Sequence, residues 1–242
     1  MKRSYAAALV FVLAFAAAAI AMPATARADN AGTIDAYVTP YYNSSGDVVH
    51  VGKYSAGLAS SDRGRFVATI QQMRKQWMQL SFPELYVAAI RLYDMGYRNE
   101  ATYWFYSAQY AGRQFQAFSD PNKLGSIGSK AFELYHAQDA FFQLTGTDIN
   151  GYAFGNIDAA VKILAQVRNE RRTVPDVRKI YPGVAFISQS QWASRNAIIQ
   201  SGLGDLEKQM QSQKAQIAGQ RAQNGTQAKF GHLNSQQFPG GF

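Results

Sequence analysis

Apolar residues recur at helical spacing along most of this chain. The first such run has intervals of three and four residues, and it comprises Phe66, Ile70, Met73, Trp77 and Leu80. Residues at this spacing share one face of an α-helix, which has about 3.6 residues per turn. We therefore predict a first helix over residues 63–80. The sequence Ser-Ser-Asp at 60–62 offers an N-terminal cap for it.

Four further helices are predicted in the same way, over residues 83–95, 99–118, 129–144 and 157–171. Ser81 and Glu84 have the spacing of a capping box, and this predicts the start of the second helix. A last helix is predicted from about residue 191, with Gly202 and Gly204 as points of interruption. Residues 145–155 hold three glycines and are predicted to form a loop, whereas 183–187 are too short to decide between a strand and a loop.

The two ends of the chain differ from this helical middle. Residues 33–42 and 47–54 are rich in β-branched and aromatic residues and flank a turn-forming Asn-Ser-Ser-Gly, which predicts a hairpin or, because of Pro40, an irregular arm. Residues 219–242 are rich in Gln, Asn and Gly and are predicted to be disordered when free. The predicted fold is mainly α: a helical domain over 61–218 that follows an N-terminal arm or hairpin over 29–60.

The first 28 residues have the pattern of a secretory signal. Lys2 and Arg3 precede an apolar run from Ala6 to Met22, and the sequence Ala-Arg-Ala ends at Ala28. This predicts cleavage after Ala28 and a periplasmic location, the alternative being an uncleaved anchor. No second apolar run approaches membrane length, so no stable membrane insertion is predicted after cleavage.

Charge and cysteine content narrow the classes of function. The chain has 24 Lys and Arg, of which three lie in residues 1–28, so 21 stand against 16 Asp and Glu in the mature part and the charge falls from +8 to +5. This mild basic excess does not predict a nucleic-acid partner, since nucleic-acid binders usually concentrate basic charge on one face. The chain has no cysteine, which excludes a disulfide scaffold, thiol catalysis and cysteine-bound metals.

The predicted helices over 83–95 and 99–118 resemble one repeat of the tetratricopeptide superfamily, including its branch with longer, variable loops. Six residues have the types and relative spacings of that repeat. They are the small residues Ala89, Ala101 and Ala108, the larger apolar residues Leu92 and Phe105, and the glycine of the turn, Gly96. Small residues let two helix axes approach closely, and the aromatic ring fills the space between them. The match covers about 30 residues and departs from the repeat at Leu85, where tryptophan is usual, and at Arg113, where proline is usual. A single repeat cannot form a solenoid, so we expect a compact domain.

The resemblance implies that a protein or peptide binds in a groove lined by the first helix of the pair. Tyr, Trp and Arg are enriched in interface hot spots, and the two helices carry more aromatic residues than one buried face can use. The candidate partner-binding residues are Tyr86, Arg91, Tyr93, Tyr97, Tyr103, Trp104, Tyr106 and Tyr110. The alternative is that each ring fills the core or lies against the N-terminal arm.

Little in the sequence predicts catalysis. His136 has Glu133 and Asp139 at three residues on either side, a trio that could share a helix face, but such charged neighbours are ordinary on helices. Residues 125–130 lack the spacing of a phosphate loop and are interpreted as the start of a helix. No pair among Glu84, Asp94 and Glu100 stands out as a glycosidase pair, which needs two carboxylates within a defined distance. We predict no catalytic residue, no metal site and no cofactor.

Three functional hypotheses follow. The first is a periplasmic protein-binding module, in a specific version an immunity protein that neutralises a toxic effector delivered into the envelope. The second is an accessory component of an envelope secretion or assembly machine that docks through its Gln-rich tail. It predicts that deleting residues 219–242 weakens association without unfolding the core. The third is a peptidoglycan or lipid hydrolase that would depend on a carboxylate such as Glu133 or Asp139.

Overall fold

The structure, a computed structural model, describes residues 52–241 of the chain and confirms a mainly α-helical fold. Its α-helices are α2 (Ser55–Leu58), α3 (Arg63–Lys75), α4 (Phe82–Asp94), α5 (Arg98–Phe118), α6 (Lys130–Ala153), α7 (Ile157–Glu170), α8 (Val177–Ile180), α9 (Trp192–Ser212), α10 (Lys214–Gln223) and α11 (Thr226–Phe230). Short 3-10 helices lie at η2 (Gly52–Tyr54), η3 (Trp77–Gln79), η4 (Pro121–Lys123) and η5 (Gln189–Gln191).

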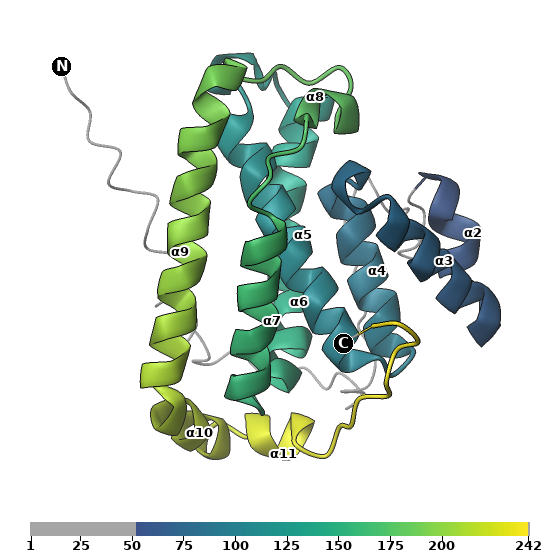
Figure 1. The fold of residues 1–242 in the computed structure, drawn as a ribbon, viewed down its shortest axis with the longest axis vertical. Coiled ribbons are helices and arrows are strands. Elements are labelled where there is room, and N and C mark those ends of the chain that lie inside the picture. Colours follow the sequence, from purple (N-terminus) through teal and green to yellow (C-terminus); the bar gives the residue numbers. More distant parts are fainter. Residues whose placement is uncertain (1–51, 242) are drawn as a thin grey trace.

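Helix α5 is the centre of the fold. It contacts α4, α6, α7 and α9, and its packing with α4 is the most extensive in the described residues. Figure 1 shows α5, α6, α7 and α9 side by side, with α2 and α3 beyond α4 and with α10 and α11 across one end. One continuous hydrophobic core joins these helices, from Tyr54 to Phe238.

Local signals in the sequence set the starts and ends of several helices as predicted. Asp62 accepts a hydrogen bond from the backbone N–H of Arg65 at 2.6 Å and caps α3. Ser81 and Glu84 form both bonds of the capping box at the start of α4. Gly96 ends α4 with a φ of +84°, the left-handed conformation that glycine adopts at little cost.

One helix is longer than predicted, and another lacks a predicted interruption. Helix α6 continues through the predicted loop at 145–155 as far as Ala153. Within it, Gly151 lies so close to the ring of Phe230 that an added Cβ would collide with it, so this glycine lets α11 pack on α6. Helix α9 passes through Gly202 and Gly204 without a break. It is held there by Arg168 of α7, which donates to Glu207 at 2.7 and 3.0 Å. In both helices tertiary contacts outweigh the low helix propensity of glycine.

The predicted β-structure is found only as one isolated bridge in the described residues, between Ser119 and Phe186. Two backbone hydrogen bonds flank it, and they join Asp120 to Ala185 and Ile187 to Phe118. The predicted N-terminal hairpin lies outside the described residues, apart from 52–54, and these form the 3-10 helix η2. The predicted signal segment also lies outside them.

The prediction of disorder over 219–242 is wrong for its described part. Helices α10 and α11 cover residues 214–223 and 226–230. Residues 231–241 then run back along the surface to α3 and α5, where the yellow trace ends in Figure 1. Phe230 and Phe238 are 4% and 1% exposed, and Arg221 donates to the carbonyl of Gly151 at 2.6 Å. The prediction was based on the polar composition of the segment and gave too little weight to its two aromatic residues. Burial of these two rings offsets the conformational entropy that is lost when the segment is ordered.

Candidate protein-interaction site

The aromatic residues that were predicted to line a groove are in the interior. None of them is more than 5% exposed: Tyr86, Tyr93, Tyr97, Tyr103, Trp104, Tyr106 and Tyr110. Helix α5, which carries four of them, is covered by α4, α6, α7 and α9 and has no free aromatic face. The expected exposed aromatic surface is therefore corrected, and the alternative of core filling describes these rings.

Their hydroxyl groups are part of the internal hydrogen bonding. Tyr106 donates to Asn150 at 2.8 Å, and Tyr110 donates to Asn196 at 2.8 Å. Burial raises the pKa of Tyr110 to about 12, because the low-dielectric interior disfavours the phenolate. Burial also raises the pKa of Tyr86 and of Tyr103, where the hydrogen bond to Glu170 adds to the effect.

Arg91 also has a structural role. It is partly buried, and its Nε donates to the carbonyl of Leu58 at 2.9 Å while its Nη1 pairs with Asp94 at 3.1 Å. The bond to Leu58 connects α4 to α2, whereas the pair with Asp94 lies within α4. The eight predicted partner-binding residues thus lie together around α4 and α5, but seven stabilise the core and Arg91 holds a neighbouring helix.

The acidic residues considered for catalysis have structural partners as well. Glu133 accepts from the backbone N–H of Gly128 at 2.8 Å, and Asp139 accepts from Gln116 at 3.3 Å. The ring of His136 lies against Phe132 at 4.4 Å between centroids. Within residues 52–241 no group of three His, Cys, Asp or Glu side chains could hold a metal ion. Among the described helices, none has the length and apolar character needed to cross a membrane.

The sequence did not predict the surface on which the C-terminal tail is bound. We use the term tail for residues 231–241. The tail lies on α3, on the turn between α4 and α5, and on the first turn of α5. We call the residues that contact it there the tail-binding surface: Arg63, Gln71, Arg74, Gly96, Tyr97, Arg98, Asn99 and Glu100.

The first half of the tail is bound mainly through main-chain groups. Arg98 donates to the backbone carbonyl of Asn234 at 2.6 Å. The backbone N–H of Asn99 donates to Oγ of Ser235 at 2.9 Å. The N–H of Gln236 donates to the carbonyl of Gly96 at 2.8 Å, so a main-chain carbonyl of the α4–α5 turn is hydrogen-bonded to the tail.

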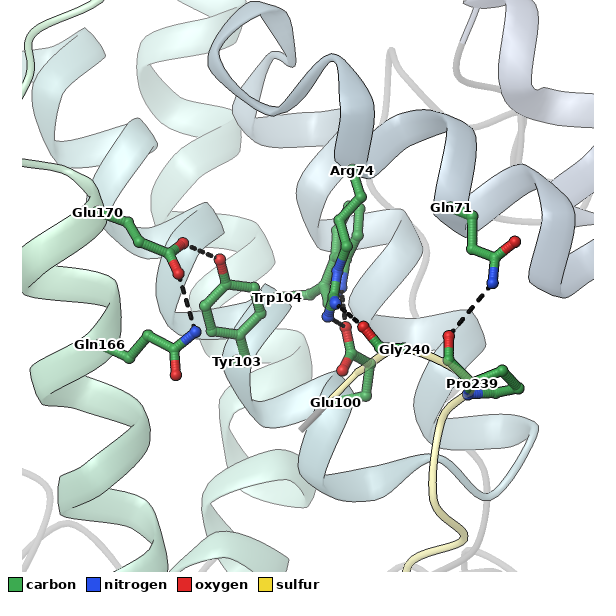
Figure 2. A network of polar contacts seen from close by, with 9 residues as sticks. All are labelled: Gln71, Arg74, Glu100, Tyr103, Trp104, Gln166, Glu170, Pro239 and Gly240. Carbon is green, nitrogen blue, oxygen red and sulfur yellow. Dashed lines mark hydrogen bonds and ion pairs between the residues drawn. The ribbon is translucent and has the colours of Figure 1, made fainter.

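The second half of the tail is held by two side chains of α3 (Figure 2). Gln71 donates to the carbonyl of Pro239 at 3.2 Å, and Arg74 donates to the carbonyl of Gly240 at 2.6 Å. Arg74 also pairs with the buried carboxylate of Glu100. Figure 2 shows Arg74 between Glu100 on one side and the tail on the other. Glycine is needed at 241, since an added Cβ would collide with the Glu100 carboxylate.

Phe238 anchors the tail. Its ring is 1% exposed and meets Tyr97 edge to face, with centroids 5.2 Å apart. Tyr97 in turn stacks on Phe66 at 6.5 Å. Arg74 lies 6.0 Å from the Phe238 ring, within the range of a cation–π contact. The tail is thus an extended peptide with one buried aromatic side chain.

A small pocket lies next to the start of the tail. It has a volume of about 240 Å³ and is bounded by α5, α6, α7 and α11, with Asn99, Asn156, Gln227 and Leu233 among its lining residues. Asn99 belongs also to the tail-binding surface and accepts from Tyr152 at 2.8 Å. The pocket therefore continues the same face of the molecule.

A signal for this site was present in the sequence. Phe230 and Phe238 stand in an otherwise polar segment, and buried aromatic residues are the usual means by which such a segment is ordered. The role of the arginines that bind the tail could not be predicted from the sequence, because their contacts join residues more than 130 positions apart.

Comparison of the chain with protein families, with curated proteins and with solved structures found no match. The function is therefore inferred from the residues of this chain alone. Chemically, the tail-binding surface can bind an extended peptide: it offers arginine and amide donors, one backbone acceptor and a recess for an aromatic ring.

Proposed function

We propose that this protein is an exported, periplasmic protein-binding module. The observation that supports it best is the docked tail: residues 231–241 bind the helical surface through backbone hydrogen bonds and one buried aromatic ring. Proteins that recognise peptides use the same combination, in which main-chain bonds supply affinity and side-chain pockets supply specificity. Export is proposed from residues 1–28, with cleavage after Ala28.

We also propose that α4 and α5 are a divergent repeat unit of the tetratricopeptide type. The small residues of the resemblance, Ala89, Ala101 and Ala108, are fully buried, as close helix packing requires. Gly96 stands in the tight turn between the helices. Within this proposal the partner binds at the turn end of the pair, because the faces of the two helices are covered by neighbouring helices.

The proposed module has one specific version and one alternative. The specific version is an immunity protein that neutralises an envelope-targeting effector, and it requires one tight partner and no turnover. The alternative is an accessory component of a secretion or assembly machine that uses the tail itself for docking. Most tail residues other than Phe238 are exposed to solvent, so they are accessible to a docking partner, as this alternative requires. Deleting 219–242 would not test it cleanly, because the deletion also removes the buried residues Phe230 and Arg221.

The test is affinity capture from envelope extract with the mature protein, residues 29–242. Replacing Tyr93 or Trp104 would be uninformative, since both are fully buried and their loss would damage the core. The useful variant is Arg63→Glu with Arg98→Glu, which reverses charge on the tail-binding surface. Arg65→Glu is the matched control, because it lies on α3 two residues from Arg63 and so on another face.

We expect one dominant partner with the wild type and with Arg65→Glu, and its loss with the double variant. Circular dichroism must show that all three proteins keep the same helicity. Failure of every form to capture a partner would reject the binding module. A partner that the double variant retains would place the interaction elsewhere on the molecule.

A further inference from the structure

The tail-binding surface carries more positive charge than the tail can neutralise. Three of its residues are arginines, Arg63, Arg74 and Arg98, and all three donate hydrogen bonds to the tail. Residues 231–242 contain no Asp or Glu. Among the ion pairs of the described residues, this surface has only the one between Arg74 and Glu100.

The guanidinium groups of Arg63 and Arg98 therefore donate their hydrogen bonds to uncharged oxygens of the tail. Arg63 donates to the side-chain amide oxygen of Gln236, and Arg98 donates to the backbone carbonyl of Asn234. A carboxylate acceptor would add the attraction of opposite charges to such a bond, and a guanidinium can bind both oxygens of a carboxylate at once. A carboxylate in either position would be a better partner than the group that stands there now.

The other contacts of the tail-binding surface depend little on the amino-acid sequence of the bound segment. Gln71, Arg74 and Arg98 all bind backbone carbonyls, which any peptide can present in the same path. The one deep side-chain contact is that of Phe238, and the residues on either side of it are exposed. An occupant thus needs an aromatic ring, an extended backbone and a small residue opposite Glu100.

From this charge imbalance we propose that the tail-binding surface is a site for an acidic, aromatic peptide segment of a partner protein, and that the tail is its weaker, intramolecular occupant. The partner segment places an aromatic ring where Phe238 lies and a carboxylate opposite Arg63, two positions before the ring. It binds in place of the tail, so the tail also restricts access to the site. This proposal rests on the proposed function and adds the chemistry of the partner.

The test uses the full mature chain and two labelled peptides. One peptide has the sequence of residues 233–242, and the other differs from it by Gln236→Glu. Two protein variants loosen the tail: Phe238→Ser removes its anchor, and Gln236→Lys brings a like charge to Arg63. Gln236 is exposed, so the second variant removes no buried group. Binding is measured by fluorescence anisotropy at low salt, with circular dichroism as the check on folding.

We expect both loosened variants to bind the peptides at least 10-fold more tightly than the wild type, whose site is filled by the tail. The Gln236→Glu peptide should bind about 10-fold more tightly than the unaltered one, which corresponds to one charge-assisted hydrogen bond. Adding Arg63→Gln to Phe238→Ser should remove that preference. High salt should reduce it, because the site lies at the surface.

Three results would overturn the proposal. If neither folded variant binds a peptide, the surface serves only the intramolecular contact. If both peptides bind equally, the acidic preference is wrong. A concentration-dependent dimer of the wild type that Phe238→Ser abolishes would also overturn it, since the occupant would then be the tail of a second copy. These outcomes are independent of the extract experiment: a partner captured there without peptide selectivity keeps the proposed function and rejects this inference.

Discussion

The indole Nε1 of Trp104 donates a hydrogen bond of 2.6 Å to Oε1 of Glu100, deep in the first half of α5. Glu100 is 1% exposed, and the same oxygen accepts from Arg74. Arg74 extends to the tail through the carbonyl of Gly240 at 2.6 Å. One buried carboxylate thus connects the centre of the core to the last described residues of the chain (Figure 2).

The first prediction concerns that carboxylate. Glu100→Gln keeps an oxygen for Trp104 but removes the charge that holds Arg74, and it leaves a partly buried guanidinium without its anion. We expect the free energy of unfolding to fall by about 2 kcal/mol, measured by urea denaturation. Asp205→Asn is the control, since its pair with Lys208 is exposed, and we expect a change within about 0.5 kcal/mol. Equal effects of the two substitutions would contradict the structural role of Glu100.

The second prediction concerns the anchor of the tail. Phe238→Ala removes a buried ring at the edge of the core and should lower stability by about 2–4 kcal/mol. It should also make residues 231–241 sensitive to limited proteolysis. Pro239→Ala is the matched control, because Pro239 is exposed and its carbonyl, which accepts from Gln71, is kept. Proteolysis of the wild-type tail at the same rate as that of the variant would show that Phe238 does not hold it.

The fold was predictable where the signals are local. The caps at Asp62 and Ser81 and the turn at Gly96 depend on neighbours within a few residues, and all three were found as predicted. Helix α6 continues through Gly151, which packs against the ring of Phe230, and this contact between distant residues is one that no local pattern encodes.

The candidate site was predictable only in part. Sequence reasoning selected the aromatic residues of α4 and α5 because of their type, but burial depends on how many helices cover them. The structure places Tyr97 behind the tail and the other predicted rings in the core. Arg63 and Gln236 meet across 173 positions, so their pairing could not be inferred from spacing.

The third prediction concerns alkaline pH. In the unfolded chain Tyr110 ionises near its ordinary pKa of 10.0, whereas in the folded protein its pKa is about 12. Between these values the unfolded state binds fewer protons than the folded state, so stability must fall as the pH rises, by about 1.4 kcal/mol per pH unit for such a group. Tyr110→Phe should reduce this slope by about that amount, measured as urea stability at about pH 9, 10, 11 and 12. An unchanged slope would contradict the burial of this hydroxyl.

The fourth prediction compares two glycines inside helices. Gly112 of α5 faces the side chain of Gln138, and an added Cβ would collide with its amide oxygen. Gly112→Ala should therefore destabilise the protein by about 1–3 kcal/mol, although alanine favours helix. Gly202 of α9 has nothing within 4 Å of an added Cβ, so Gly202→Ala should stabilise by up to about 1 kcal/mol. Thermal unfolding of both variants would check the pair, and a stabilising Gly112→Ala would contradict the close packing of α5 on α6.

The central claim is that the polar tail, residues 231–241, is bound as an extended peptide on the tail-binding surface. Its most direct test is hydrogen–deuterium exchange in a protein of residues 29–242 at the amide of Gln236, which donates to the carbonyl of Gly96 at 2.8 Å. We expect this amide to be protected in the wild type and to lose its protection in Phe238→Ser while the amides of α5 remain protected. Exchange of the Gln236 amide in the wild type at the rate of an unstructured peptide would contradict the account.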